Sequence, residues 1–483
     1  MQPQPNTIVV PPVSERSYWL DEALRGDRGA PCPILEGTVS ADVCIVGGGF
    51  CGLWTAYELT ERDPSLDVLL LEADVCGAGG SGSNGGMVSA SWHDLVALCR
   101  FFGMGEGGRY AAALAHQLDE VAAWSERHAA DIGYRRDGNL FAAAGDWQQR
   151  DDDELLELAS ALGHGDRLRS VSADEARDIA DSPLFHGGLF TPDLAVVQPA
   201  RLARELRRVL LERGVRICEH TPMLEVRPST PASVSTPRGL VRGEHVVIAN
   251  GAWAAAQRPF RRAFFVATDF VVASEPIPER LDEIGWTSGT GICDSREDFF
   301  YLRRTDDGRV VIGGGTLGIA RGARIAGAVL TSHRKARVAA AGLSWLFPQL
   351  AGVRLARAWS GPMDLTASLL PFFTTLPSGN VHAGLGFSGH GLSATKLGGK
   401  TLASLVLNAD DEWSTLPVVG PPMSKLPPEP LRWPLLKATF WAADSGDLAE
   451  QHGGRRGRLR SLVASSIDAY RTSRRPAPRR QIG

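Results

Sequence analysis

Three glycines near the start of the chain have the spacing of a dinucleotide site. Gly47, Gly49 and Gly52 follow the short apolar run 43–46, which predicts a buried strand, a tight turn and then a helix. In such a unit the first glycine forms the turn, the second lets the backbone approach a pyrophosphate, and the third lets the helix pack on the strand. The N-terminus of the helix then offers free N–H groups to the phosphates.

An acidic residue stands where such a site needs one. Glu72 ends a second apolar run that begins at Val68, and it follows Gly52 by 20 residues. A carboxylate at this distance meets a ribose 2′-hydroxyl and disfavours a 2′-phosphate. The pattern therefore predicts a bound dinucleotide, and it leaves open whether this is FAD or NAD.

Two further glycine-rich stretches follow. Residues 77–86 are mostly glycine, which is typical of backbone that runs close against a flat ligand, and Ser81, Ser83 and Asn84 add hydrogen-bonding groups. A flexible linker is the alternative, but the stretch comes directly after the strand that Glu72 ends. Residues 386–391, Gly-Phe-Ser-Gly-His-Gly, precede the helix expected at 394–407 and form a second glycine-rich helix start.

Few side chains are candidates for contact with a substrate. Tyr301 and Arg303 share one face of a predicted strand, and Arg304 lies on the other, because side chains alternate along a strand. An arginine on the ligand face would hold a carboxylate or phosphonate with two hydrogen bonds, whereas a solvated arginine is the alternative. His390 either lines the site or is a polar residue of its turn, and Trp92 either reaches the substrate or belongs to the core. Tyr301 and His390 are the candidates for a catalytic role.

Length and composition describe a globular enzyme-sized chain. The 483 residues exceed what one core accommodates, and 43% hydrophobic and 22% charged residues with a net charge of −4 are ordinary for a soluble protein. No 18-residue apolar run and no secretory signal are seen, so no transmembrane segment is expected. Seven cysteines without a C-x-x-C pair indicate a reducing, cytoplasmic location, and no motif for zinc or nucleophilic catalysis appears, so no metal is expected.

The C-terminus is strongly basic. Residues 453–483 hold nine arginines and one acid, Asp468. Such a tail binds nucleic acid or anionic lipid in some proteins, but Tyr470 is its one aromatic residue, so aromatic residues do not alternate with the arginines. A solvated tail is therefore expected, and no nucleic-acid partner.

Periodicity gives a coarse map of the remaining elements. Helices are expected at 94–130, 152–162, 172–180, 199–213 and 331–346, a hairpin at 134–143, and antiparallel strands at 263–277 and 299–315. An apolar strand at 246–249 returns the chain to the first sheet, so the fold class is α/β with an α+β second domain. The expected parts are an N-terminal arm (1–37), a discontinuous Rossmann-like domain (38–93, 188–258, 356–410), an antiparallel-sheet substrate domain (94–187, 259–355) and a C-terminal extension (411–483).

Four motifs together resemble the FAD-dependent oxidoreductases of the D-amino-acid oxidase superfamily, in particular the branch of glycine, sarcosine and γ-glutamylputrescine oxidases. The motifs are 46–52 with Glu72, the stretch 77–86, Val246-Val-Ile-Ala-Asn-Gly-Ala, and 386–391. The N-terminal stretches 17–21 and 41–50 and the late Pro-rich stretch 427–433 also resemble a bacterial subgroup of aminophosphonate oxidoreductases.

The resemblance implies FAD as cofactor and a substrate sheet that covers the flavin. It also implies that the helix start after 389 faces the flavin and stabilises negative charge there, and it puts Asp364 near a flavin contact. The cofactor-binding residues it implies are Gly47, Gly49, Phe50, Cys51, Gly52, Glu72, Ala73, Ser83, Asn84, Gly85, Gly86, Met223, Asn250, Gly251, Trp253, Gly389, His390, Gly391 and Leu392.

The chain departs from sarcosine oxidases at two points. These enzymes attach their flavin through a C-terminal cysteine, whereas no cysteine follows Cys293 here, so non-covalent FAD is expected. They also carry a lysine after the second glycine motif, where this chain has Leu392 and Ser393. Backbone amides would then supply most of the charge at that edge of the flavin.

The implied reaction takes a hydride equivalent from a carbon next to an amine nitrogen, with O2 or an electron carrier as final acceptor. The imine would hydrolyse to an aldehyde or keto acid. Three alternatives stay open at this point: a flavoenzyme of the same fold acting on a 2-hydroxy acid or polyol, an NAD-dependent enzyme, and a non-catalytic flavin-binding protein.

Overall fold

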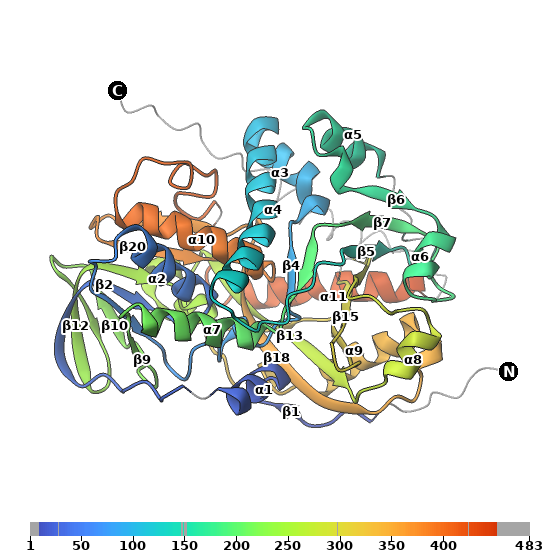
Figure 1. Ribbon diagram of the computed structural model, residues 1–483, viewed down its shortest axis with the longest axis horizontal. Coiled ribbons are helices and arrows are strands. Elements are labelled where there is room, and N and C mark those ends of the chain that lie inside the picture. Colours follow the sequence, from blue (N-terminus) through green and yellow to red (C-terminus); the bar gives the residue numbers. More distant parts are fainter. Residues whose placement is uncertain are drawn as a thin grey trace.

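The computed structural model describes residues 9–451, except 28, 146–147, 149–151, 297 and 424. The basic tail beyond residue 452 lies outside the described residues. Two large sheets form the molecule, one in the left half and one in the right half of Figure 1.

The first sheet has eight strands drawn from three separate parts of the chain. Its strands are β2 (Gly37–Val46), β3 (Val68–Leu71), β9 (Arg216–Cys218), β10 (Glu225–Arg227), β11 (Ala232–Ser235), β12 (Gly239–Ile248), β19 (Phe372–Thr375) and β20 (Val381–Leu385). The order β20–β12–β2–β3–β9 is parallel throughout, as in a Rossmann-like sheet. Strand β3 is buried along its whole length, which explains its continuous apolar run.

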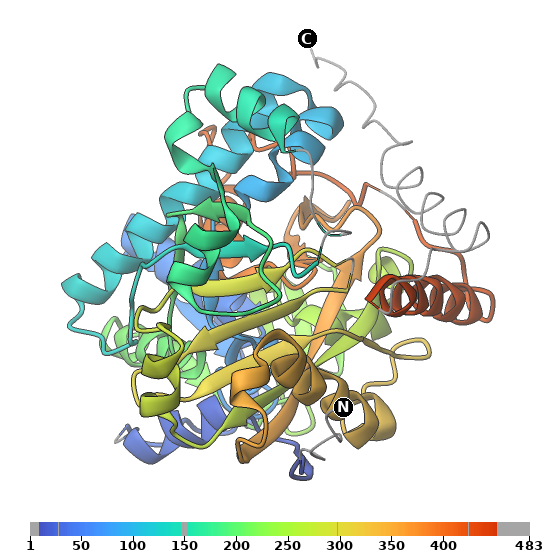
Figure 2. The ribbon, with the colours of Figure 1, turned by 90° about the vertical axis from the view of Figure 1, so that its right-hand side faces the viewer.

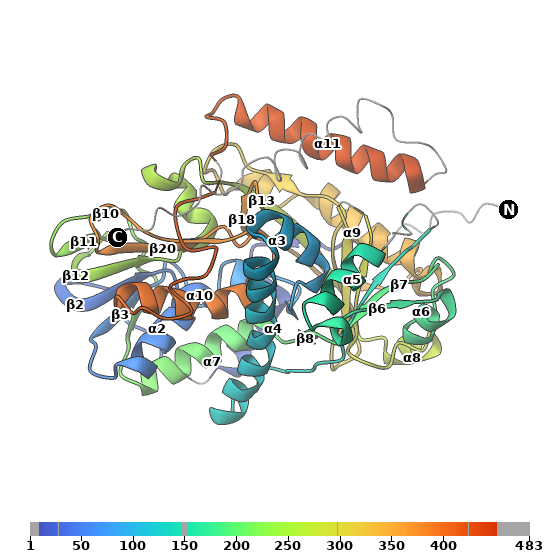
Figure 3. The same cartoon turned by 90° about the horizontal axis from the view of Figure 1, so that it is seen from above.

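Helices cover this sheet. They are α2 (Phe50–Arg62), α7 (Pro199–Glu212) and α10 (Gly391–Val406), which lie together on one face of the sheet (Figures 1 and 3). The start of α7 follows the sequence closely: Pro199 is its first residue, and the side chain of Gln198 accepts from the N–H of Arg201.

The second sheet has ten strands. They are β1 (Val13–Ser14), β5 (Asn139–Ala142), β6 (Arg169–Val171), β7 (Gly188–Thr191), β13 (Phe264–Ser274), β14 (Gly291–Asp294), β15 (Phe300–Arg304), β16 (Val310–Gly314), β17 (Gly318–Ile319) and β18 (Leu355–Thr366). All eleven residues of β13 are buried, and this strand lies inside the sheet between β18 and β16. The pairs β1–β18 and β5–β14 are parallel, so the sheet is mixed and not purely antiparallel as expected.

Several expectations need correction. No hairpin forms at 134–143, because β5 pairs with β7 and β14 while Arg135 bridges to Val196. The helix expected at 94–130 is two helices, α3 (Leu95–Phe102) and α4 (Met104–Arg127), divided at Gly103, whose φ of +88° breaks the helix. Strands β7 and β18 lie in the ten-stranded sheet, although the expected boundaries put both with the dinucleotide domain.

The remaining helices surround the second sheet. They are α1 (Tyr18–Gly26), α5 (Asp153–Ala161), α6 (Ala173–Ile179), α8 (Pro278–Glu283), α9 (His333–Leu346) and α11 (Arg432–Gln451). Helix α11 was not expected from the Pro-rich sequence, and it lies along the outside of the molecule in Figures 2 and 3. Among the helices of the described residues, none is long and apolar enough to cross a membrane.

Candidate active site

The two glycine-rich helix starts lie side by side. Cys51, in the first turn of α2, has its sulfur 3.7 Å from the carbonyl oxygen of Gly384, at the end of β20. Further along the same pair of helices, a Cβ on Gly399 of α10 would lie only 2.7 Å from backbone and side-chain atoms of Trp54 in α2. The absence of a side chain at Gly399 therefore lets α2 and α10 pack backbone against side chain and brings their N-termini to one region.

The first turn has the form that its glycines predict. Gly47 has a φ of +116°, and a Cβ there would lie 2.5 Å from the carbonyl oxygen of Ala249. A Cβ on Gly52 would lie 2.0 Å from the carbonyl oxygen of Gly47. Glu72 accepts from the N–H of Gly48 at 2.7 Å, and burial raises the pKa of its carboxyl.

The stretch 77–86 is bound both to the first turn and to distant side chains. The hydroxyl of Ser81 accepts from the N–H of Phe50 at 2.9 Å, at the very start of α2. The indole N–H groups of Trp19 and Trp359 donate to the carbonyls of Asn84 and Ser83 at 3.0 and 2.8 Å. These contacts make the stretch a fixed surface, and no flexible linker is present.

Within this stretch the polar side chains bond mainly to their own backbone. The amide of Asn84 donates to the carbonyls of Gly80 and Ser81 and accepts from the N–H of Gly86. The hydroxyl of Ser83 donates to the carbonyl of Gly79 at 3.1 Å. Gly85 and Gly86 are buried between these bonds and the second sheet, and the carbonyl of Gly86 accepts from the N–H of Val197.

Tyr301 and Arg303 lie on the face of β15 that points toward this stretch. A Cβ on Gly85 would lie 2.5 Å from the ring of Tyr301, and a Cβ on Gly86 would lie 2.5 Å from the guanidinium of Arg303. Leu302 points the other way, into the core beneath α9. The alternation read from the sequence thus places both residues beside the glycine stretch.

Arg303 is only 4% exposed, and its contacts are structural. It donates to the carbonyls of Gly86 and Val197, and its guanidinium lies 5.2 Å from the ring centre of Trp19. Burial lowers the pKa of Arg303 to about 10. None of these contacts tests whether Arg303 binds substrate, so that role stays a prediction. Arg304, on the opposite face of β15, donates to Asp282 and to the carbonyl of Trp286.

The second glycine turn is held by a buried carboxyl. Asp364, on β18, accepts from the N–H of Gly386 at 2.6 Å, and its carbonyl accepts from the N–H of Ser388. Asp364 thus fastens the turn before α10 to the ten-stranded sheet. His390 is half-buried at the start of α10, where its ring lies 6.2 Å from that of His93.

Trp92 lies deeper. It is 2% exposed, its indole donates to Asp193 at 2.7 Å, and its ring lies 4.7 Å from that of His164. Its role as a substrate contact stays a prediction. His93, Asp94 and His390 come within 4.8 Å of one another between Trp92 and the start of α10.

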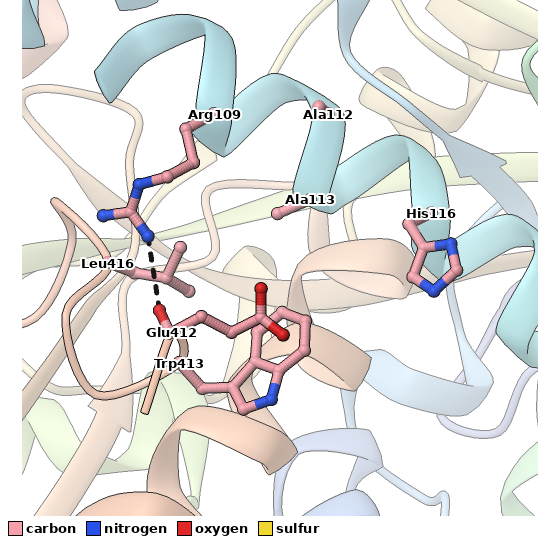
Figure 4. Close-up of a pocket in the computed structure, with 7 residues that line it drawn as sticks. All are labelled: Arg109, Ala112, Ala113, His116, Glu412, Trp413 and Leu416. Carbon is pink, nitrogen blue, oxygen red and sulfur yellow. Dashed lines mark hydrogen bonds between the residues drawn. The ribbon is translucent and has the colours of Figure 1, made fainter. Parts of the chain in front are cut away.

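One surface cavity lies apart from the glycine turns. It has a volume of about 360 Å³ and is lined by one side of α4 and by the segment that follows α10 (Figure 4). Arg109 closes one edge by donating to the carbonyl of Glu412. It shares no residue with the glycine turns or with β15, so we assign it no part in the chemistry.

Similarity to known proteins shows which family the chain belongs to. The family of FAD dependent oxidoreductases that includes the D-amino-acid oxidases matches residues 42–405. The chain belongs to this family. The γ-glutamylputrescine oxidoreductase of Escherichia coli K12 is 29% identical over 394 residues, which cover 81% of this chain and 88% of that protein. The β subunit of sarcosine oxidase from an Arthrobacter species is 23% identical and covers 76% of this chain and 87% of that protein.

Solved structures of the family share the fold. The crystal structure of glycine oxidase from Geobacillus kaustophilus aligns with a TM-score of 0.64 over 77% of this chain and 96% of that one, at 22% identity. The cofactor of the family is FAD, and the enzyme class is that of amine and amino-acid oxidoreductases.

The residues present fit FAD. The cradle at Gly47 and Gly52 admits no side chain, and the carboxyl of Glu72 lies beside it. The buried side-chain oxygen of Asn250, directly after β12, has no hydrogen-bond partner among the described residues, which suits a donor on a ligand. Of the other implied contacts, Trp253 is 48% exposed with its ring against Gly79, Met223 is half-buried, and Ala73 is exposed.

Several residues of this FAD-dependent oxidoreductase escaped the sequence analysis. Trp19 and Trp359 hold the glycine stretch, and Asp269 lies behind Tyr301. Tryptophan and aspartate on apolar strands give no periodic signal for such contacts. For Asp269, the available sequence signal was a charged residue inside the otherwise largely apolar run 264–274.

Asp364 predicts a pH dependence of stability. Burial raises its pKa to about 6, although N–H groups of Gly386 and Phe387 lower it. The folded state therefore binds a proton more tightly than the unfolded state, and the contribution of Asp364 to stability is lost as the pH rises from about 4 through about 6. Relative to Asp364→Asn, we expect the unfolding free energy of the natural protein to fall by about 3 kcal/mol over this range. Urea unfolding of both proteins between pH 4 and 7 measures this difference, and a constant difference would contradict the assignment.

Proposed function

We propose that this protein is an FAD-dependent oxidase or dehydrogenase that oxidises a C–N bond of a small amine, amino acid or aminophosphonate. The product is an imine, which water converts to an aldehyde or keto acid. The proposal is carried by one arrangement: the two glycine turns that start α2 and α10 lie together, and the strand with Tyr301 covers the glycine stretch between them. FAD supplies the acceptor for the hydride equivalent.

Each part of the arrangement has a role in the proposal. Gly47, Gly49 and Gly52 hold the pyrophosphate at the start of α2, and Glu72 holds the ribose. The start of α10 lies at the redox ring, where its N–H groups favour the negative charge of the reduced cofactor. Tyr301 covers the ring from the second sheet, excludes water and positions the substrate.

The relatives support the substrate class. The similar proteins are named as a γ-glutamylputrescine oxidoreductase, a sarcosine oxidase subunit and a glycine oxidase. Since no cysteine follows Cys293, we propose non-covalent FAD, reoxidised by O2 or an electron carrier in a reducing, cytoplasmic setting. We include aminophosphonates among the substrates because the stretches 17–21, 41–50 and 427–433 resemble those of the aminophosphonate oxidoreductases.

An anaerobic screen tests the proposal. FAD-loaded protein is mixed with γ-glutamylputrescine, sarcosine, glycine, putrescine and 2-aminoethylphosphonate, and with lactate, glycolate and glycerol, while the flavin absorbance is followed. We expect at least one amine, and no hydroxy compound, to bleach the flavin band. Bleaching by a hydroxy acid or polyol alone would replace the proposal by the alternative chemistry of the same fold, and bound flavin that none of the compounds reduces would favour a non-catalytic flavin protein.

A further inference from the structure

A buried carboxylate lies directly behind Tyr301. Asp269, in the buried strand β13, is only 9% exposed. Its Oδ2 accepts from the hydroxyl of Tyr301 at 2.6 Å, while its Oδ1 accepts from the N–H groups of Phe270 at 2.7 Å and Gly314 at 3.1 Å. Nothing in the binding of FAD requires an acid at this depth of the sheet.

These bonds fix which group donates. A backbone N–H can only donate, so the two amides commit Oδ1 as an acceptor and hold the carboxyl in one orientation. Oδ2 then faces the phenol oxygen of Tyr301 and accepts the hydrogen bond of its O–H group. Burial next to this carboxylate raises the pKa of Tyr301 well above its ordinary value, so the phenol keeps its proton and continues to donate it to Asp269.

The ring of Tyr301 lies between the glycine stretch and strand β16. Tyr301 pairs with Gly313 on β16, and a Cβ on Gly313 would lie 2.2 Å from the phenol oxygen. The ring therefore lies across the bare backbone of Gly313 and reaches Asp269, while its edge lies against Gly85. The cation two residues along the strand, Arg303, already donates to Gly86 and Val197.

We propose that Asp269 is a positioning residue that sets the polarity of the site: it accepts the only hydrogen bond that the O–H group of Tyr301 can donate, so that the phenol oxygen meets a ligand as a hydrogen-bond acceptor. Such an oxygen binds an N–H donor and disfavours a carboxylate or a carbonyl oxygen. The substrate class that fits is one that presents its amine nitrogen, and not its carboxylate, to Tyr301. This inference rests on the proposed function in taking the side of Tyr301 that faces the glycine stretch as the substrate side.

Asp269→Asn reverses the polarity without changing the shape. The two backbone N–H groups still require an acceptor, so the amide oxygen takes the place of Oδ1 and the NH2 group faces Tyr301. The phenol then accepts from the amide and turns its own proton toward the ligand. An oxygen acceptor on the ligand is now preferred over an N–H donor.

Calorimetric titration of FAD-loaded protein with n-butylammonium and with butyrate, two probes of equal chain length, measures the polarity. In the natural protein we expect tighter binding of n-butylammonium, and in Asp269→Asn a shift of the affinity ratio toward butyrate by roughly 100-fold, tenfold for each probe. In Tyr301→Phe the ammonium affinity falls about tenfold, and adding Asp269→Asn to this variant then shifts the ratio by less than about threefold. This non-additivity separates an effect through Tyr301 from a loss of charge or of folding.

Asp294→Asn is the matched control. Asp294 is a buried aspartate on the neighbouring strand β14, and it pairs with Arg296 and the N–H of Phe300, not with Tyr301. Asp294→Asn removes the same charge as Asp269→Asn, and we expect it to leave the affinity ratio of the two probes unchanged. An equal ratio in all variants, an equal shift in Asp294→Asn, or no measurable binding of n-butylammonium to the natural protein would overturn the inference.

The two proposals can fail separately. If the affinity ratio shifts in Asp269→Asn but no amine bleaches the flavin, the proposed function fails and the inferred polarity of Tyr301 stands. If amines bleach the flavin and the affinity ratio does not shift, only the inferred polarity fails.

Discussion

Gly52→Ala is expected to lower the affinity for FAD by roughly 100-fold and the unfolding free energy by about 3 kcal/mol. The added Cβ would lie 2.0 Å from the carbonyl oxygen of Gly47 and 3.2 Å from Ile45. Both neighbours belong to the strand and turn that Gly52 packs on, so neither can rotate away. Helix α2 must move off the strand, and its N–H groups then lose their position at the pyrophosphate.

Fluorescence titration with FAD and thermal unfolding of the apoprotein measure the two effects. Gly105→Ala is the matched control, since Gly105 also lies in a helix and a Cβ there meets nothing within 4 Å. We expect this control to keep its FAD affinity and to gain about 0.5–1 kcal/mol of stability. Equal FAD affinity in the two variants would show that the turn at Gly47 and Gly52 does not hold the cofactor.

Lys396→Met is expected to destabilise the protein by about 3–5 kcal/mol. Lys396 of α10 is 3% exposed, and its ammonium pairs with Glu58 of α2 and lies 3.1 Å from Glu120 of α4 and 4.8 Å from the ring centre of Trp54. Methionine fills a similar volume but leaves Glu58 buried without a countercharge. Since this cation joins α10 to α2, its loss also weakens the contact between the two glycine turns.

Urea unfolding with and without FAD measures the change. Lys437→Met serves as control, because Lys437 is exposed on α11 and only lies near the ring of Trp433, at 5.7 Å. Its stability should stay within about 0.5 kcal/mol of the natural protein. A similarly small effect of Lys396→Met would mean that α10 does not depend on this ion pair for its position.

The sequence predicted those parts of the fold that local patterns determine. The glycine turn at 47–52, the strand ended by Glu72, the start of α7 at Pro199 and the alternation at Tyr301 and Arg303 all lie where their patterns placed them. In each, the spacing of a few neighbouring residues decides the geometry. The family and its FAD cofactor followed from the same motifs.

Local sequence patterns did not predict contacts between segments that lie far apart along the chain. Asp269 and Tyr301 are 32 residues apart, and Trp359 meets Ser83 across 276 residues. The pairing of β5 was read as a local hairpin because its true partners, β7 and β14, follow far along the chain. Arg303 shows the same limit: its face was predicted, but the carbonyls of Gly86 and Val197 that it binds belong to other segments.

The most direct test of the arrangement is the stoichiometry and attachment of the flavin. Apoprotein is loaded with FAD, freed of excess cofactor and precipitated with acid, and the flavin is measured in the pellet and in the supernatant. One FAD per chain, released entirely into the supernatant and absent from Gly52→Ala prepared in the same way, is the predicted result. Protein that retains no flavin, retains it in the acid pellet, or retains it equally in Gly52→Ala would contradict a single non-covalent FAD held between the two glycine turns.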